Sequence, residues 1–130
     1  MNHALEAITT REAPAAVGPY SQAIKSGEMV FLSGQIGLDP ATGQLVGDSV
    51  REQASQVTLN LTAVLEAAGA AVDDIIKANI FLVDMSDFPV VNDIYAAWLG
   101  EHRPARATVA VAALPLGAKI EIDLVARVSE

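Results

Sequence analysis

Residues 104–122 read PARATVAVAALPLGAKIEI and belong to two predicted apolar strands, over residues 105–113 and 119–128. Arg106 begins the first strand, and Glu121 lies in the second. A strand that only fills a core needs neither charge, because burying an unpaired charge is costly in free energy. Arg106 and Glu121 are therefore the first candidates for a functional site.

The final strand alternates between an apolar and a polar face, which is typical of a strand with one side on a core. Its apolar face carries Ile120, Ile122, Leu124, Ala126 and Val128. Its polar face carries Lys119, Glu121, Asp123 and Arg127, together with Val125. Glu121 is thus predicted to project away from the core.

Periodic apolar residues predict two helices. Ser49 and Glu52 form a capping box at the start of the first helix, and Gly69 is well placed to end it. The stripe that faces a sheet consists of Val50, Ala54, Val57, Leu61, Val64, Leu65 and Ala68. The second helix begins near Asp87 and tolerates Pro89 in its first turn. Its buried face consists of Val91, Ile94, Tyr95, Trp98 and Leu99.

The other regular segments are predicted strands. Residues 21–26 and 29–33 predict a hairpin with a turn at Gly27, and the β-rich, weakly charged residues 75–83 predict a central strand. The order β-β-β-α-β-α-β-β defines an α+β domain with two helices on one side of a mixed sheet. Two helices leave the other side bare, so we expect neighbouring subunits to cover it.

Composition bounds the class of protein. The length of 130 residues is typical of one domain, here residues 1–130. Hydrophobic residues make up 52% of the chain, and the mean hydropathy of +0.35 is high for a small soluble monomer. No apolar run approaches the ~20 residues of a membrane helix. The surplus apolar surface therefore indicates an oligomer interface.

The charge distribution and the cysteine content indicate which partners the protein binds and in which compartment it is found. The formal net charge is −8, and the basic residues are scattered from Arg11 to Arg127, whereas nucleic-acid binders gather theirs on one face. The chain starts without the basic and apolar regions of a secretory signal, and it contains no cysteine. We therefore expect a cytoplasmic protein that binds neither nucleic acid nor a membrane.

Arg106 and Glu121 each have a structural as well as a functional interpretation. The Arg106 guanidinium suits a substrate carboxylate, but a salt bridge within the protein would explain it equally well. Glu121 suits water activation, although plain solvent exposure is the commoner reason for a glutamate on a polar face. If the last two strands formed a simple hairpin, the two side chains would lie roughly 16 Å apart. Either the strands are not neighbours, or the site combines residues of different chains.

Other polar residues give weaker signals. Tyr20 follows a Gly-Pro loop and is either a hydrogen-bonding lid or an aromatic residue packed on the core. Gly34 ends a strand, where its amide could hold an anion or simply form a turn. Asn92 lies in the first turn of a helix, where polar surface residues are usual. His3 and His102 have no neighbouring ligand set, so we expect no metal site, and no motif calls for a cofactor.

Six motifs follow one another along nearly the whole chain. They are Gly18-Pro19-Tyr20, Ser33-Gly34-Gln35, Ala67-Ala68-Gly69, Asn92 with Tyr95, Pro104-Ala105-Arg106 and Lys119-Ile120-Glu121-Ile122. Together they resemble the RidA branch of the Rid (YjgF) family of reactive-intermediate deaminases. The resemblance implies a chorismate-mutase-like fold with a six-stranded mixed sheet, a homotrimer with sites between subunits, and no cofactor. It also implies hydrolysis of 2-aminoacrylate, 2-iminopropanoate or 2-iminobutanoate to 2-keto acids and ammonia.

The same resemblance assigns roles to individual residues. Arg106 would clamp the substrate carboxylate, and Glu121 would position the water that attacks the imine carbon. Thr108 stands where several relatives carry a pocket-lining cysteine, so it would line the pocket and alter side-chain preference. The pocket would be shaped further by Tyr20, Ser33, Gly34 and Asn92.

Two other functions stay open at the level of sequence. A non-catalytic protein that binds small carboxylates or keto acids would use the same pocket. An endoribonuclease activity has been attached to members of the family. The acidic net charge and the lack of a catalytic histidine pair weigh against it here.

Overall fold

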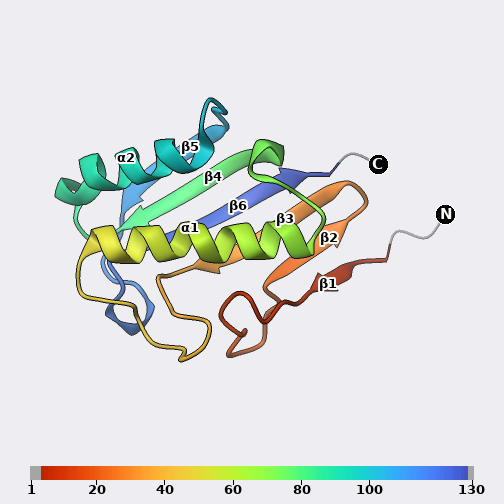
Figure 1. Cartoon of the computed structure of the whole chain (residues 1–130), viewed down its shortest axis with the longest axis horizontal. Coiled ribbons are helices and arrows are strands. Elements are labelled where there is room, and N and C mark those ends of the chain that lie inside the picture. The colour runs from red at the N-terminus through yellow and green to blue at the C-terminus, as the bar shows by residue number, and fades with distance from the viewer. Residues whose placement is uncertain (1–3, 129–130) are drawn as a thin grey trace.

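A computed structural model describes residues 4–128 (Figure 1). The order of its elements is the predicted β-β-β-α-β-α-β-β. The strands are β1 (Glu6–Ile8), β2 (Ala23–Ser26), β3 (Met29–Gln35), β4 (Ile75–Leu82), β5 (Ala105–Ala110) and β6 (Ile120–Arg127). The helices are α1 (Val50–Ala67) and α2 (Phe88–Leu99), with short 3-10 turns at η1 (Val72–Asp74), η2 (Met85–Asp87) and η3 (Pro115–Gly117).

The six strands form one mixed sheet in the order β1-β2-β3-β6-β4-β5. β2 and β3 form the predicted hairpin, with Ser26 opposite Met29 across the turn at Gly27. β4 pairs with β5 in parallel and with β6 in antiparallel, which confirms that β4 is a central strand. The predicted α+β class with a six-stranded mixed sheet is thus confirmed.

β5 and β6 are not neighbours, because β4 lies between them. The simple hairpin of the last two strands is therefore excluded. β5 is also shorter than predicted, since it ends at Ala110 instead of Ala113. The partner strand explains this difference: β4 stops at Leu82, whose carbonyl accepts the Val111 amide at 2.8 Å, and later residues have no strand to pair with. β5 is an edge strand with mostly exposed residues.

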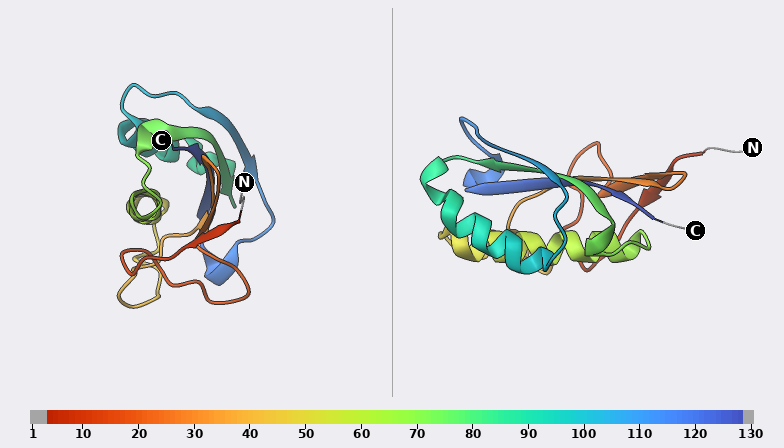
Figure 2. Two further views of the ribbon diagram at one scale, coloured as in Figure 1. Left: turned by 90° about the vertical axis from the view of Figure 1, so that its right-hand side faces the viewer. Right: turned by 90° about the horizontal axis from the view of Figure 1, so that it is seen from above.

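Both helices lie on one face of the sheet, as predicted (Figure 2). The core fills the space between this helix layer and the sheet, and it is aliphatic because the chain has few aromatic residues. The alternation predicted for β6 is confirmed, with the residues from Ile120 to Ala126 buried at every second position. Large, fully buried side chains include Leu61, Leu65, Ile80, Leu82, Ile120, Ile122 and Leu124.

The predicted signals set both ends of α1. The Ser49 hydroxyl oxygen accepts the Glu52 amide at 3.1 Å, and the hydroxyl donates to the Glu52 carboxylate at 2.9 Å. Gly69 follows the helix with a φ of 82°, a left-handed conformation that favours glycine. The register of α1 is therefore fixed, and its apolar stripe faces the sheet with Val57, Leu61 and Val64 completely buried.

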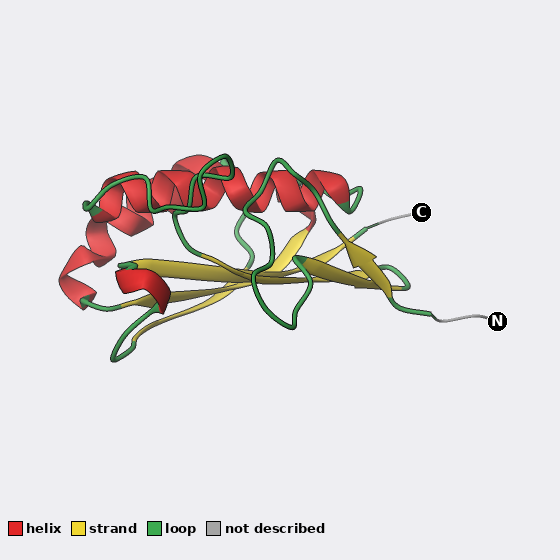
Figure 3. Ribbon diagram, turned by 90° about the horizontal axis from the view of Figure 1, so that it is seen from below, coloured by secondary structure: helices red, strands yellow, loops and turns green. Residues whose placement is uncertain are grey.

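The opposite face of the sheet carries no α-helix within the described residues (Figure 3). Phe31 and Val109 project from this open face, with 48% and 47% of their surfaces exposed. These two apolar side chains on the uncovered face are available to contact another molecule. Between residues 4 and 128, no helix is long and apolar enough to cross a membrane.

Candidate active site

One cavity brings four of the predicted site residues together. It has a volume of ≈ 520 Å³ and is lined by Tyr20, Ser33, Gly34 and Glu121. Its other walls come from residues within 14–17 and 35–38 and from η3. We call it the Glu121 cavity. Residues distant in sequence meet here because β3 and β6 are neighbours in the sheet.

Gly34 makes room for the Glu121 carboxylate. A Cβ atom on Gly34 would lie 2.5 Å from Glu121 Oε2, much closer than side chains approach one another. Gly34 also lies in an irregular part of β3, because the pairing with β6 shifts between Leu32 and Gln35. The local structure of Gly34 is therefore a strand irregularity that also makes room for Glu121, and anion binding by its amide stays a prediction.

The surroundings of Glu121 suit a carboxylate that accepts a proton. It is half-buried on the open face, and burial, followed by the negative charge of Asp123, raises the pKa of the Glu121 carboxyl. Asp123 accepts a hydrogen bond from Asn79 Nδ2 at 2.8 Å, whereas no side chain within residues 4–128 bonds to the Glu121 carboxylate. A carboxylate with a raised pKa and no such partner is suited to accept a proton from water.

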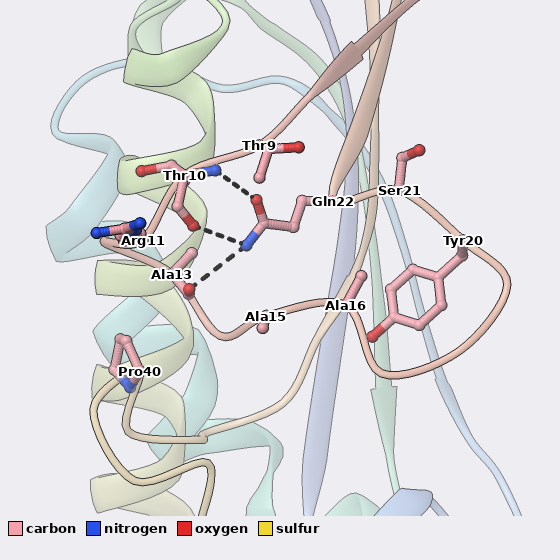
Figure 4. A pocket seen from close by; sticks show the side chains of 10 residues that line it. All are labelled: Thr9, Thr10, Arg11, Ala13, Ala15, Ala16, Tyr20, Ser21, Gln22 and Pro40. Carbon is pink, nitrogen blue, oxygen red and sulfur yellow. Dashed lines mark hydrogen bonds between the residues drawn. The ribbon is translucent and has the colours of Figure 1, made fainter.

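Gln22 holds the loop that carries Tyr20 (Figure 4). Its side chain is 3% exposed, and its Oε1 accepts the Thr10 amide at 2.7 Å. Its Nε2 donates to three backbone carbonyls between residues 10 and 14, at 2.7 to 3.4 Å. Tyr20 and Ala15 line both the Glu121 cavity and a second cavity beside Gln22, so this loop separates the two. Sequence reasoning missed Gln22, although an amide at the start of an apolar strand was an available signal.

Replacing Gln22 with leucine is expected to lower the free energy of unfolding by about 2–4 kcal/mol, because several buried backbone groups would lose their partner. Urea denaturation of the two proteins measures the difference. Gln44→Leu, at an exposed turn position, is the matched control and should stay within about 0.5 kcal/mol of the wild type. An equally small effect at Gln22 would show that other contacts hold the loop.

Arg106 lies beside α2. Its Nη1 donates to Asn92 Oδ1 at 2.7 Å. Its guanidinium carbon lies 5.3 Å from the centre of the Phe88 ring and 5.4 Å from that of the Tyr95 ring, which are cation–π distances. Because the three α2 residues are spaced by four and three, they share one helix face. They hold the guanidinium beside a cavity of ≈ 480 Å³, the Arg106 cavity, which Asn92 and Tyr95 also line.

Among the described residues, Arg106 has no carboxylate partner. The ion pair found there joins Arg127 to Glu28. A salt bridge within residues 4–128 therefore does not explain Arg106. Asn92 accepts from one nitrogen only, so most of the donor fork can still receive a carboxylate in bidentate geometry. Sequence reasoning missed Phe88, which the spacing from Asn92 could have indicated.

Two buried hydroxyl groups near Arg106, those of Tyr95 and Thr108, have no hydrogen-bond partner within residues 4–128. Burial raises the pKa of the Tyr95 phenol despite the opposing charges of Arg106 and Arg103, so the phenol stays protonated at neutral pH. Thr108 follows Arg106 by two residues and shares its face of β5, but it lines neither the Glu121 cavity nor the Arg106 cavity. Its place in a pocket stays a prediction.

Arg106 and Glu121 lie on opposite faces of the sheet. Arg106 of β5 pairs with Ala78 of β4, whose side chain faces the helices. Phe81 of β4 projects from the open face and pairs with both Glu121 of β6 and Val109 of β5, so these two residues are on the open face as well. Val109 lies two strands away from Glu121, and Arg106 lies three residues before Val109 on β5. These two offsets place the Cα of Arg106 about 14 Å from the Cα of Glu121. A small substrate cannot contact both residues in one chain.

Between residues 4 and 128, no group of three or more histidine, cysteine or acidic side chains could hold a metal ion. A ring nitrogen of His102 lies 2.7 Å from the Ile75 carbonyl oxygen, which ties the chain after α2 to the start of β4. His3 lies outside the described residues.

The fold and the two cavities define a class of protein: a small α+β protein with one cavity beside an arginine and another beside a glutamate. Sequence comparison then identifies the family. The sequence model described as endoribonuclease L-PSP matches residues 10–128. The chain therefore belongs to this family, which is the YjgF or Rid family, and the predicted resemblance is confirmed.

Relatives of known name cover most of the chain. It is 51% identical over 121 residues to Reactive Intermediate Deaminase A, chloroplastic, of Arabidopsis thaliana, covering 93% of this chain and 65% of that protein. It is 47% identical over 119 residues to the 2-iminobutanoate/2-iminopropanoate deaminase of Mus musculus, covering 92% of this chain and 88% of that protein. The structure of E. coli TdcF with bound serine superposes with a TM-score of 0.91 at 42% identity and covers 95% of this chain and 99% of that one.

Proposed function

We propose that the protein is a hydrolytic deaminase that converts 2-imino and enamine acids, including 2-iminopropanoate and 2-iminobutanoate, to 2-keto acids and ammonia. The names of the Arabidopsis and mouse relatives support this function. The observation that carries the proposal is a guanidinium with no carboxylate partner among residues 4–128, together with a half-buried glutamate whose carboxyl pKa is raised. The reaction requires a group to bind the substrate carboxylate and a base for water.

A homotrimer would bring the two groups into one site, with Arg106 of one subunit facing Glu121 of its neighbour. Two observations support this arrangement. One chain keeps the two residues on opposite faces of the sheet. The open face exposes Phe31 and Val109, which an interface would bury. We propose that residues 1–130 form one domain of each subunit and that the protein is cytoplasmic.

In this site Arg106 binds the substrate carboxylate, and Asn92 fixes the plane of its guanidinium. Glu121 accepts a proton from water while the water oxygen bonds to the imine carbon. Water adds to the imine in its protonated, iminium form, which gives a neutral carbinolamine. The protonated Glu121 then returns its proton to the amine nitrogen, ammonia leaves, and the carbinolamine hydroxyl gives up its proton to the Glu121 carboxylate as the carbonyl forms. An enamine first becomes an imine by protonation at carbon. Because the imine carbon is already polarised, holding it beside water supplies most of the acceleration.

Other residues would complete the pocket around this chemistry. Tyr20, Ser33 and Gly34 line the cavity that contains Glu121, so we assign them to substrate orientation. The Ser33 hydroxyl donates to the Ser21 carbonyl at 2.6 Å, which leaves its oxygen free to accept from a ligand. The Thr108 hydroxyl, which has no partner in the described part of the chain, is assigned to the substrate side of Arg106.

A non-catalytic binder of small carboxylates is the second candidate, and the serine bound to E. coli TdcF is the observation that favours it. It requires Arg106 but not Glu121. The description of the family includes an endoribonuclease, but the net charge of −8 disfavours a phosphate-rich ligand.

Imine hydrolysis in competition with semicarbazide tests the function. An amino-acid oxidase generates 2-iminopropanoate, and a deaminase should lower semicarbazone formation in proportion to its concentration. Analytical ultracentrifugation of the same preparation should show a trimer. A folded trimer that leaves semicarbazone formation unchanged but binds pyruvate in calorimetry would favour the binder instead.

A further inference from the structure

Leu116, within η3, has a backbone conformation that leucine rarely adopts. Its φ of 58° and ψ of 21° lie in the left-handed region, and no other non-glycine residue between 4 and 128 has a positive φ. This region is unfavourable for any residue with a Cβ atom, whereas glycine adopts it readily. The conformation of the turn would therefore favour glycine at position 116.

The Leu116 side chain gains little from the core in return. It is 68% exposed, so most of its apolar surface stays in contact with water. It lines the Glu121 cavity, together with Tyr20 and Gly34. An unfavourable backbone thus holds an apolar side chain beside the proposed catalytic carboxylate. Strain of this kind is typical of functional sites.

The base of the turn is anchored to α1. Gln53 is 1% exposed, and its Oε1 accepts the Lys119 amide at 2.8 Å while its Nε2 donates to the Gly47 carbonyl at 2.9 Å. Within the turn, the Ala118 amide donates to the Pro115 carbonyl at 3.0 Å. The Lys119 bond holds the chain just after η3 to α1, and the Ala118 bond closes the turn, so Leu116 is presented as a wall of the cavity.

We propose that Leu116 determines which aliphatic 2-imino acids the enzyme prefers, by contacting the substrate side chain. This inference rests on the proposed function, in which Arg106 receives the carboxylate and Glu121 the water. The part of the substrate left to recognise is then its alkyl group, which is a methyl in 2-iminopropanoate and an ethyl in 2-iminobutanoate. Leu116 is a large apolar residue in the cavity of Glu121 and is not committed to the core.

The test compares kcat/KM for the two imines in the wild type and in Leu116→Asn. Asparagine tolerates the left-handed conformation and is close to leucine in size, so this variant removes mainly the apolar contact. We expect the preference for 2-iminobutanoate over 2-iminopropanoate to fall about three- to tenfold, at or just below the low end of the roughly 10- to 200-fold that one methylene group contributes in a closed apolar pocket, because Leu116 is one wall among several. Leu59→Asn is the control, because Leu59 is 63% exposed on α1 and lies outside the three cavities described. It should leave the preference unchanged.

Two further measurements separate the possible failures. Leu116→Gly should melt at or above the wild-type temperature, and a clear fall, or dissociation of the oligomer, would overturn the inference by showing a structural role. An equal loss for both imines would overturn it as well. If the wild type does not hydrolyse imines, the proposed function fails. The affinities of the wild type and of Leu116→Asn for 2-oxobutanoate and pyruvate then decide the role of Leu116. A fall in the preference for 2-oxobutanoate would support side-chain selection by Leu116, and an unchanged preference would overturn it.

Discussion

Replacing Arg106 with alanine is expected to lower kcat/KM for 2-iminopropanoate by about 10³-fold. A hydrogen bond to a charged group contributes about 1.5–3 kcal/mol, and a carboxylate in bidentate geometry forms two with a guanidinium. Their loss corresponds to about 10²- to 10⁴-fold, since each factor of ten is about 1.36 kcal/mol. Steady-state hydrolysis measures the loss, and thermal denaturation should show a fold close to wild type, because the Arg106 side chain is exposed and bonded mainly to Asn92.

Two further variants show whether the loss is specific to the Arg106 guanidinium. Arg127→Ala removes an arginine whose ion pair with Glu28 is exposed, and it should keep kcat/KM within about twofold of the wild type. Arg106→Lys restores the charge without the planar donor fork, so it should recover only part of the loss. If Arg106→Ala kept kcat/KM within about tenfold of the wild type, the carboxylate would have to be bound elsewhere.

Local signals in the sequence predicted the elements well, because the residues that fix helix ends and strand faces are close together in the chain. Ser49 with Glu52 and the glycine at position 69 marked both ends of α1. The alternation from Ile120 to Ala126 identified the buried face of β6. The predicted end of β5 was wrong, because β5 ends where its partner β4 stops, and β4 is distant from it in the sequence.

The candidate site could be predicted in part. Arg106 and Glu121 were visible as charges in apolar strands, but their separation onto two faces follows from the register in which β5 and β6 pair with β4, which local patterns do not encode. Gln22 and Leu116 were missed for different reasons. Gln22 acts through backbone groups of another segment, and nothing in the sequence indicates that a leucine occupies a left-handed turn. The site residues as a set remain a prediction that the variants described here test.

Replacing Glu121 with glutamine is expected to lower kcat by about 10²- to 10⁴-fold, the usual contribution of a general base. The amide can still bond to water but cannot accept its proton, so KM should change much less than kcat. The wild-type kcat should rise with pH through the raised pKa of the Glu121 carboxyl, because the reaction needs the carboxylate. The residual activity of Glu121→Gln should lack this acidic limb in a kcat–pH profile.

The stability of Glu121→Gln separates a catalytic glutamate from a structural one. A carboxyl whose pKa is raised by folding favours the folded state below its usual pKa and opposes it as pH rises through the raised value. Removing the charge should therefore leave the protein at least as stable at neutral pH, as urea denaturation can show. Asp123→Asn removes the neighbouring charge that raises the Glu121 pKa, so it should keep the base and move the acidic limb to lower pH. A destabilised Glu121→Gln with unchanged kcat would instead give this glutamate a structural role.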